Sequence, residues 1–405
     1  MLGKIKPNLY KVVKLATLVK NLKNLGKLLL FPFALGLLAP AAVDAGGGHH
    51  SGHHDQHSAH GHSGDASPST MLMGKTTFVV GGVDGVTSMG TAKDETTFNY
   101  DMKLMGMTSF TGKDMLMTAI RSGNFAMMDP FGMSGAARLD TVFNSGDNLE
   151  LHKAFYKFPV SDDMEITFGP KLRQDDLLGV WPSSYPSDPI LFVLNQAGAS
   201  DTYSKKMGAG AGITWSKDRV VASALFVSED ANDSTKGFLQ DNGRDHITTQ
   251  LAWVDDSYTV ALAYTNADSA NTDGSANAND YTSYGISGTY KFSNDSSAIP
   301  SSINAGYGWK NPDKVDDSSN IEDGNTWTVG AMWNDAFIEG NNFGFGIGTA
   351  ETHRDDSDYD DPLAWEAFYE VAINHSVTIT PAVFNIEKNG ADDVSGALVK
   401  TTFNF

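Results

Sequence analysis

The stretch Trp365-Glu-Ala-Phe-Tyr-Glu-Val371 decides the fold class of this chain. Successive side chains of a strand point to opposite faces, so Trp365 and Tyr369 share one face while Glu366 and Glu370 share the other. A soluble barrel turns its apolar face inward and its charged face to water. A membrane barrel reverses this, with an apolar outer band, aromatic girdles at both interfaces and a polar lumen. Aromatic residues opposite carboxylates favour the second arrangement.

Other stretches repeat this alternation with a spacing that suits two aromatic girdles. Tyr258 and Tyr264 lie six residues apart on one face of a predicted strand, as do Trp327 and Trp333. The opposite faces carry mainly Gly, Ala and Thr. A soluble β-sandwich, the alternative, would bury one large apolar core and carry fewer small residues on its second face. We therefore predict an all-β fold, a transmembrane antiparallel β-barrel.

Clusters of Gly, Asp, Asn and Ser separate the predicted strands, which number about sixteen. Their predicted starts are Thr76, Thr96, Met115, Leu149, Met164, Met207, Val220, His246, Tyr258, Tyr281, Ser302, Asn325, Asn342, Ala364, Val377 and Gly396. Short connections such as Asp255–Ser257 alternate with long acidic ones such as Ala267–Asp280 and Thr352–Leu363. The longest connection, Gln174–Lys206, follows the fifth strand. An even count near sixteen fits a barrel that encloses an aqueous channel.

The charge of the chain excludes one large class of function. The formal net charge is −20, and the first 45 residues carry seven Lys and one Asp, so residues 46–405 carry −26. Nucleic-acid binding draws most of its affinity from neutralised phosphates and would require the opposite sign. A hydrophobic content of 40% and a mean hydropathy of −0.26 are too low for a polytopic helical membrane protein. The chain has no cysteines, so disulfides and thiolate chemistry play no part.

Residues 1–45 are predicted to be a signal peptide. A basic region from Lys4 to Lys27 leads into the apolar run Leu28–Ala39. In Val43-Asp-Ala45, small residues stand at the −3 and −1 positions of an A-x-A-like cleavage site. A short buried helix or a membrane anchor is the alternative. The apolar run is shorter than the ~20 residues that a spanning helix needs.

Residues 46–70 are predicted to be a disordered tail, followed by the barrel over residues 71–405. Gly, Ser and His dominate the tail, and such a composition buries too little apolar surface to offset the entropy of ordering. Its candidate metal ligands are His49, His50, His53, His54, His57, His60 and His62. Neutral imidazoles at this density bind Zn, Cu or Ni loosely, and adventitious affinity and metal capture both stay open. No cofactor is expected.

Three groups of motifs carry a family resemblance. The first is Thr108–Asp114, which leads into Ile120–Phe125, and the more specific ones are Tyr156–Val160, Phe168–Pro186 and Gly208–Trp215. These stretches resemble the cyanobacterial outer-membrane porins of the OprB (carbohydrate-selective) family. The resemblance implies an outer-membrane porin and carries no information on its solute. We predict a trimer in outer-membrane lipid that passes small hydrophilic solutes, either inorganic ions, iron among them, or carbohydrates.

One departure from the family pattern concerns the cell wall. Members of the family usually carry an N-terminal S-layer-homology domain that ties the barrel to peptidoglycan. Here the His-rich tail alone stands between the predicted signal peptide and the barrel. Contact with peptidoglycan is therefore not expected.

The loop Gln174–Lys206 is the predicted constriction of the channel. A long loop folded into the lumen narrows a pore, and unstructured loops of this length usually have a function. It combines Trp181 and Tyr185, whose rings suit sugar faces, with three prolines and with Asp175, Asp176 and Asp188. An external cap loop and a latch between subunits are the alternatives.

Basic residues on early strands are predicted to face this loop. Strand parity puts Phe168 and Pro170 on the lipid side and Lys171 and Arg173 on the lumen side. Arg121, on an earlier strand, is also predicted to face the loop. By the family resemblance, Arg173 beside Asp175 and Asp176 would set a transverse field. Ordinary charge at the barrel rim is the alternative for any one of these residues.

Methionine is concentrated in one part of the chain. Eleven of the fifteen Met lie between Met71 and Met133. Together with the His-rich tail this hints at copper, because thioether and imidazole both suit it. Methionine is also a common apolar filler, and the filler interpretation is preferred from sequence alone.

The last strand ends on an aromatic residue. Val399, Thr401, Phe403 and Phe405 share one face, which resembles the signal that barrel-assembly machinery recognises in its clients.

No nucleophile elbow, zinc-protease motif or phosphate-binding loop occurs, so an enzyme is not expected. A non-conducting outer-membrane scaffold or adhesin, and an outer-membrane lipid hydrolase, remain alternatives to a passive channel.

Overall fold

The computed structural model describes residues 68–85, 87–88, 91–92, 94–126, 131–132, 137–186, 189–240, 243–268, 280–293, 298–312, 323–350, 353–354, 362–388 and 392–405. The predicted signal peptide and His-rich tract lie outside these residues. Sixteen long strands form the wall: β1 (Ser69–Asp84), β4 (Thr97–Ser109), β5 (Met115–Gly123), β6 (Glu150–Ser161), β7 (Met164–Arg173), β8 (Met207–Lys217), β9 (Val220–Ser228), β10 (Asp245–Val254), β11 (Tyr258–Ala267), β12 (Tyr281–Lys291), β13 (Ser302–Pro312), β14 (Gly324–Trp333), β15 (Asn342–Thr349), β17 (Leu363–Asn374), β18 (Val377–Ile386) and β19 (Val394–Asn404). The two-residue β16 (His353–Arg354) pairs with β14, and β2 (Thr87–Ser88) pairs with β3 (Thr91–Ala92).

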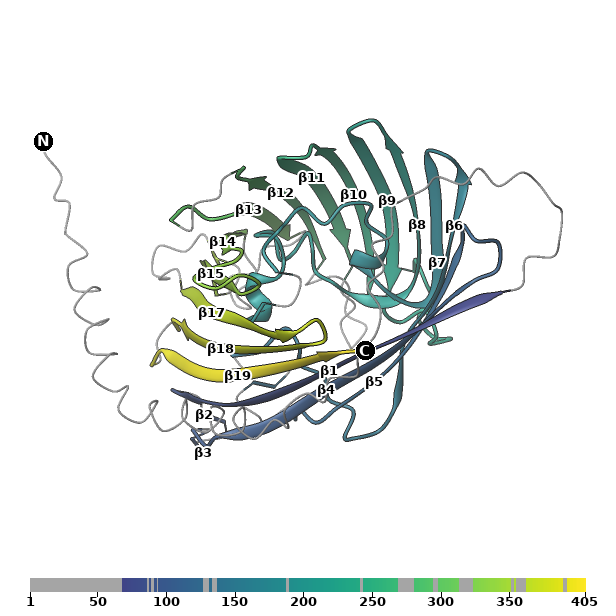
Figure 1. Ribbon diagram of the computed structural model, residues 1–405. Coiled ribbons are helices and arrows are strands. Elements are labelled where there is room, and N and C mark those ends of the chain that lie inside the picture. Colours follow the sequence, from purple (N-terminus) through teal and green to yellow (C-terminus); the bar gives the residue numbers. More distant parts are fainter. Residues whose placement is uncertain are drawn as a thin grey trace, which may run out of the picture. The chain divides into compact units, whose positions relative to one another are not determined.

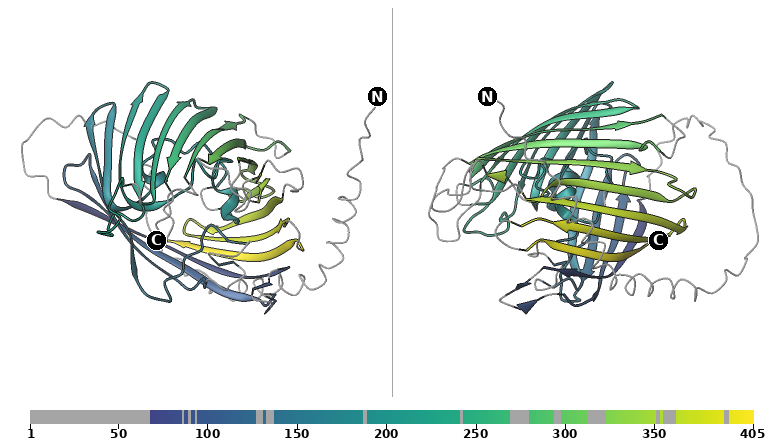
Figure 2. Two further views of the ribbon diagram at one scale, coloured as in Figure 1. Left: turned by 180° about the vertical axis from the view of Figure 1, so that it is seen from behind. Right: turned by 90° about the vertical axis from the view of Figure 1, so that its left-hand side faces the viewer.

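The sheet closes on itself through β1. This strand pairs antiparallel with β4 on one side and with β19 on the other, from Lys75↔Asn404 to Asp84↔Ser395. Figure 1 shows β1 and β19 side by side at the seam, and Figure 2 shows the wall strands from two further sides. All the other wall strands pair with their neighbours in sequence. Closure removes the free edges, which would otherwise expose unpaired backbone groups to lipid.

The sequence-based strand assignment is confirmed with one difference. Fifteen of the sixteen strands begin within two residues of their predicted starts, whereas β1 begins at Ser69 rather than at Thr76. The additional residues Ser69–Gly74 pair with the far end of β4, beyond the last residue of β19 that pairs with β1. β1 therefore extends past the closed part of the barrel, and includes the last two residues of the predicted tail.

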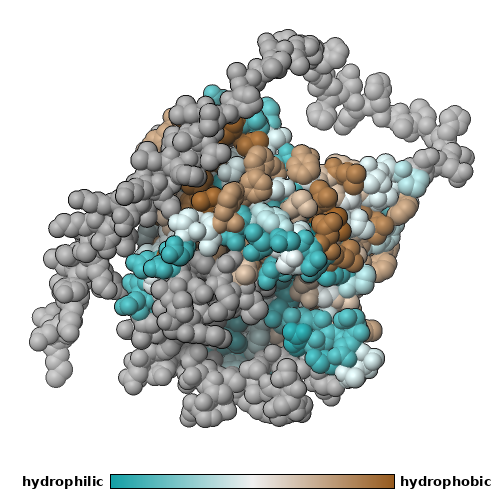
Figure 3. All heavy atoms as spheres, turned by 90° about the horizontal axis from the view of Figure 1, so that it is seen from below, coloured by the Kyte–Doolittle hydropathy of each residue, from teal (hydrophilic) through white to brown (hydrophobic). Residues whose placement is uncertain are grey.

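Aromatic side chains flank an apolar outer band near both ends of strands β11–β15, as predicted. Near the short turns, Trp333 packs on Phe343 with ring centroids 5.3 Å apart, and near the long loops Tyr264 packs on Tyr284 at 5.2 Å. Between the girdles leucine, isoleucine and valine side chains are exposed, and Leu251 and Leu262 each expose 54% of their surface. Hydrophobic residues cluster over part of the face shown in Figure 3.

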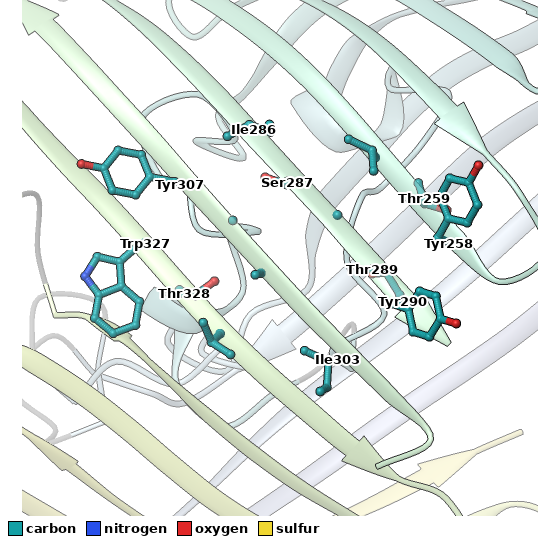
Figure 4. A pocket seen from close by; sticks show the side chains of 15 residues that line it. Tyr258, Thr259, Ile286, Ser287, Thr289, Tyr290, Ile303, Tyr307, Trp327 and Thr328 are labelled. Carbon is teal, nitrogen blue, oxygen red and sulfur yellow. The ribbon is translucent and has the colours of Figure 1, made fainter. Parts of the chain in front are cut away.

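A shallow hollow marks this outer band over β11–β14. Figure 4 shows Tyr258 and Tyr290 at one end of the hollow, Tyr307 and Trp327 at the other, and Ile286 and Ile303 between them. Small residues of β12 and β13, Gly288 and Ala305, also line it. The hollow is almost wholly apolar, which matches a surface that faces lipid rather than water.

The inner face of the wall is mainly polar, with Thr77, Asn99, Thr248 and Ser283 at 5% exposure or less. Glu366 is fully buried there, as the alternation of β17 predicted. One part of the lumen differs, because an apolar cluster packs against β1 and β17–β19 and includes residues of two loops that enter the barrel. None of the helices in the described residues is long and apolar enough to cross a membrane.

Candidate channel constriction

The loop over residues 174–206, here called the constriction loop, folds into the barrel as predicted. Its backbone amides bond to side chains on distant wall strands, from Gly179 to the Ser223 Oγ of β9 at 2.9 Å and from Ser184 to the Thr289 Oγ1 of β12 at 2.8 Å. Further along, the Thr326 Oγ1 of β14 donates to the Gly198 carbonyl at 3.1 Å. The loop thus follows the inner wall over several strands (Figure 1).

Gln174 holds the two ends of the constriction loop together. Its side chain is fully buried. The Nε2 atom donates to the Thr202 carbonyl and to the Thr248 Oγ1 of β10, both at 2.8 Å, and Oε1 accepts from the Lys205 amide at 3.0 Å. A buried amide with all these partners satisfied fixes one arrangement of the loop, because any other would leave its polar atoms unpaired.

Tyr185 fastens the middle of the loop to Glu366 on β17. The Tyr185 hydroxyl donates to Glu366 Oε1 at 2.6 Å, and the Ile190 and Leu191 amides donate to the same carboxyl group at 3.2 and 2.6 Å. Burial and the adjacent Glu366 carboxyl raise the pKa of Tyr185 well above its ordinary value, so the hydroxyl keeps its proton. Tyr185 is only 4% exposed, and the prediction that its ring contacts a solute is wrong. It anchors the loop instead.

Glycines of the wall make room for the loop. A Cβ atom on Gly330 or Gly346 would collide with the Tyr185 ring, and one on Gly306 would overlap the backbone of Ala197. Glycine inside a strand commonly marks such a close approach of another backbone. The alternation of β13, β14 and β15 places these glycines on the lumen face.

We expect the substitution Gly306→Ala to displace the loop. The added methyl group would meet the Ala197 carbonyl oxygen, a backbone atom that cannot rotate away. Overpacking of this kind costs about 1–3 kcal/mol. Thermal unfolding of the detergent-solubilised barrel measures the loss. The matched control is Gly82→Ala, where the nearest atom would be 3.6 Å away, and equal losses in both variants would contradict the proposed fit.

A second loop, over residues 124–149, also enters the barrel. Leu139 and Leu191 form an isolated backbone bridge, and the Asp140 amide donates to the Ile190 carbonyl at 3.0 Å. The side chains of Phe125 and Leu139 join Leu191 in the apolar cluster. Sequence analysis did not predict this inward path. The apolar residues within a loop were the available signal, because an exposed loop has little reason to carry them.

Charged residues line the partly exposed region where the two loops meet β6 and β7. Arg173 donates from Nε and Nη2 to the two carboxylate oxygens of Asp175, each at 2.5 Å, and the Lys153 Nζ lies 2.5 Å from Asp176 Oδ1. Burial disfavours charge on Asp175, but the Arg173 guanidinium outweighs it and lowers the pKa of this carboxyl group. This geometry differs from the predicted transverse field. The opposite charges lie side by side on one wall and not on opposite sides of the channel.

Arg121 reaches the lumen face but is not free to contact a solute. Its side chain is 7% exposed, with Nε 2.5 Å from Asp101 Oδ1 and Nη2 donating to the Thr141 carbonyl at 3.2 Å. The guanidinium also stacks on the Phe143 ring, 4.5 Å from its centroid. Arg121 therefore joins the wall to the second inward loop, and its place at the constriction stays a prediction.

A β-bulge alters the predicted parity of β7. The register shifts between Gly169 and Leu172, so Leu172 is fully buried and packs against Leu177 of the constriction loop. Phe168 is 46% exposed on the outer side, as predicted. Lys171 is partly exposed at the bulge, and no ion pair joins it to another described residue. Alternation alone could not reveal the bulge, because two residues there oppose one on β8.

Trp181 is the remaining described member of the predicted constriction. Its ring packs edge-on against Tyr203 with centroids 5.4 Å apart, and the Lys205 ammonium lies 4.7 Å from the ring centroid. Part of the indole remains exposed.

Asp188 and the seven candidate metal-binding histidines lie outside the described residues. Within those residues, no group of three or more His, Cys, Asp or Glu could hold a metal ion.

The C-terminal aromatic residues lie on the outer face at the seam. The Phe405 amide donates to the Gly74 carbonyl at 2.9 Å, and its 69% exposed ring lies over Gly74. Phe403 packs against Phe78, with ring centroids 5.4 Å apart. Both aromatic residues thus close the barrel, and a role in assembly stays a prediction.

Known proteins share this fold at low sequence identity. Pseudomonas putida OprB matches with a TM-score of 0.58 and 13% identity, over 83% of this chain and 94% of that chain. A loop L8 deletion mutant of OmpT, an outer membrane protein of Vibrio cholerae, gives 0.51 and 8% over 84% and 100%. A triple mutant of the Rhodopseudomonas blastica porin gives 0.50 and 14% over 83% and 100%. The fold is that of the outer-membrane porins.

Sequence comparison is less informative. No family model matches the chain. Uncharacterized protein sll0772 of Synechocystis sp. is 27% identical over 190 residues, which make up 46% of this chain and 35% of that protein. The match thus spans about a third of the relative's length.

Proposed function

We propose that the protein is an outer-membrane porin through which small hydrophilic solutes diffuse passively. The observation that carries this proposal is the constriction loop, which is held to the inner wall by polar contacts inside a barrel with an apolar exterior. Such a loop narrows a lumen without filling it, and partly exposed charges beside it select among solutes. Inorganic ions, iron among them, and carbohydrates are the solute classes considered.

The remaining features of the proposal follow from this role. The chain would cross the periplasm after removal of residues 1–45, insert with the help of barrel-assembly machinery that reads Phe403 and Phe405, and form a homotrimer in outer-membrane lipid. It would need no cofactor and would catalyse no reaction. Lys171 and Asp188 would contribute charge to the constriction, and the His-rich tail would bind metal ions loosely.

Ion selectivity tests the role of the charged wall. Asp175→Asn would leave Arg173 without its bidentate partner, so we expect the reversal potential in a salt gradient to shift toward anions. Arg173→Gln should shift it toward cations. The side chains are 18% and 30% exposed, and an interaction of about 1 kcal/mol in water changes a permeability ratio up to about fivefold.

The matched control is the ion pair of Lys157 and Glu165, which lies near the short turn between β6 and β7. Glu165→Gln should leave the reversal potential nearly unchanged, because this pair lies far along the strand from the constriction loop. Identical potentials in all variants would show that the solute path avoids Arg173 and Asp175.

A further inference from the structure

Six methionine residues lie on the inward-facing side of three adjacent strands, two of them on the extension of β1 past the closed part of the barrel. β1, β4 and β5 pair side by side, as Figure 1 shows. On this face the buried residues Thr77, Asp101 and Arg121 fix which positions point inward. By alternation, the same face carries Met71 and Met73 of β1, Met105 and Met107 of β4, and Met115 and Met117 of β5. We call these six residues the methionine patch.

Strand register places three of these side chains in one row. Met71 is the cross-strand partner of Met107, and Met107 is the partner of Met117. Met73 faces Met105 in the neighbouring row. Directly opposed residues of an antiparallel pair have Cβ atoms about 4.5–5.5 Å apart, a separation that flexible thioether side chains span. Three sulfur atoms from three strands can therefore converge on one point.

The two faces of these strands carry different apolar residues. The outer face carries Leu72, Leu104 and Leu116, whereas the inner face at the same level carries methionine. Met115 and Met117 pack against the apolar cluster around Phe155 and Leu172. The four methionines of β1 and β4 belong to none of the apolar clusters of the described residues, so packing in a core does not account for them, and the difference points to the sulfur atoms. The methionines are also accessible, because none is fully buried and Met71 is 56% exposed.

We infer that the methionine patch binds a soft monovalent metal ion of the Cu(I) type. Thioether sulfur is a soft ligand that selects such ions over the hard cations of the medium. The chain has no cysteine, so thioethers are its only sulfur ligands. Met71, Met107 and Met117 would form a three-sulfur site, with Met73, Met105 and Met115 as neighbouring ligands. This site goes beyond the proposed function, since a barrel that conducts nothing could still bind the ion.

Silver ion tests the inference, because Ag⁺ is a soft monovalent ion that needs no reductant. The full-length protein, folded in detergent micelles in chloride-free buffer at pH 5, is titrated with Ag⁺ by calorimetry. Imidazoles with ordinary pKa values near 6.5 are mostly protonated at this pH, whereas thioethers cannot be protonated, so the His-rich tail contributes little. X-ray absorption at the silver edge then identifies the ligand atoms.

The decisive variant replaces Met71, Met107 and Met117 together by leucine, which nearly conserves side-chain volume. We expect its Ag⁺ affinity to fall roughly tenfold or more. Removing a residue that only supports a metal ligand already costs about this much, so removing the ligands themselves should cost at least as much. The matched control Met102→Leu changes a methionine on the opposite face of β4 and should bind as the original does.

Heat-modifiable mobility in gels verifies that each variant is a folded barrel. Sulfur ligation of silver in the original protein, lost in the triple variant alone, supports the site. Unchanged affinity in the triple variant, an equal loss in Met102→Leu, or ligation by nitrogen and oxygen alone would overturn it. If the triple variant fails to fold, the single variants Met107→Leu and Met117→Leu provide the same comparison.

Discussion

Replacing Glu366 by alanine should release the constriction loop from the barrel wall. The carboxyl group accepts from the Tyr185 hydroxyl and from the Ile190 and Leu191 amides. Each donor left without an acceptor costs about 1–3 kcal/mol, so we expect the folded barrel to lose about 3 kcal/mol or more. A loop freed at its middle should also widen the channel and make its current noisier. Single-channel recording and thermal unfolding of the same preparation measure both effects.

The matched control for this substitution is Glu370→Ala. Glu370 lies on the same strand and accepts from the Asn342 Nδ2 at 3.1 Å on the neighbouring strand β15, outside the loop. Its loss should leave the conductance unchanged and cost little stability. If Glu366→Ala kept the conductance and noise of the original channel, the loop would not be held by this carboxyl group.

Replacing Arg121 by methionine should be comparably damaging, for a different reason. Asp101 is 1% exposed, and Arg121 supplies the short ion pair that compensates its charge. Removing one partner of a buried pair costs about 3–5 kcal/mol when the other charge stays buried without compensation. Lys103 Nζ lies 3.8 Å from Asp101 Oδ2 and would compensate part of that charge, so we expect a loss at the lower end of this range. The same change detaches the guanidinium from Thr141 and Phe143 of the second inward loop. Denaturant unfolding in micelles measures the loss.

A double-mutant cycle separates the ion pair from the lost packing. Adding Asp101→Asn to Arg121→Met should recover part of the stability, since the buried carboxylate that lost its short ion pair is then removed. The more exposed ion pair of Lys157 and Glu165, whose side chains are 30% and 39% exposed, serves as the comparison. Lys157→Gln breaks this pair and should lower the free energy of unfolding by about 1 kcal/mol or less. Equal losses from the exposed and the buried pair would refute the anchoring role of Arg121.

The wall of the barrel could be predicted from the sequence because each strand carries its own information. Alternation fixed which side of β17 faces the lumen, and Glu366 lies there as expected. Turn residues and alternation predicted the starts of fifteen of the sixteen strands to within two residues. The start of β1 was missed because the extension at Ser69–Met73 pairs with β4 alone, and its exposed residues lack a clear apolar face.

The contacts inside the barrel could not be predicted in the same way. Tyr185 and Glu366 are 181 residues apart in sequence, and no local pattern connects them. Arg121 was correctly placed on the inner face, but its burial depends on a second loop whose path the sequence analysis did not foresee. A usable signal existed in Gly306, Gly330 and Gly346, because lumen-facing glycines indicate where another backbone approaches the wall.

The central claim is that this barrel encloses an open, water-filled path beside the constriction loop. Single-channel recording of the purified, folded protein in planar lipid bilayers tests it most directly. We predict discrete and stable current steps that grow with salt concentration, and larger steps for Glu366→Ala. Bilayers that contain the folded barrel but show no current steps at any salt concentration would contradict the claim.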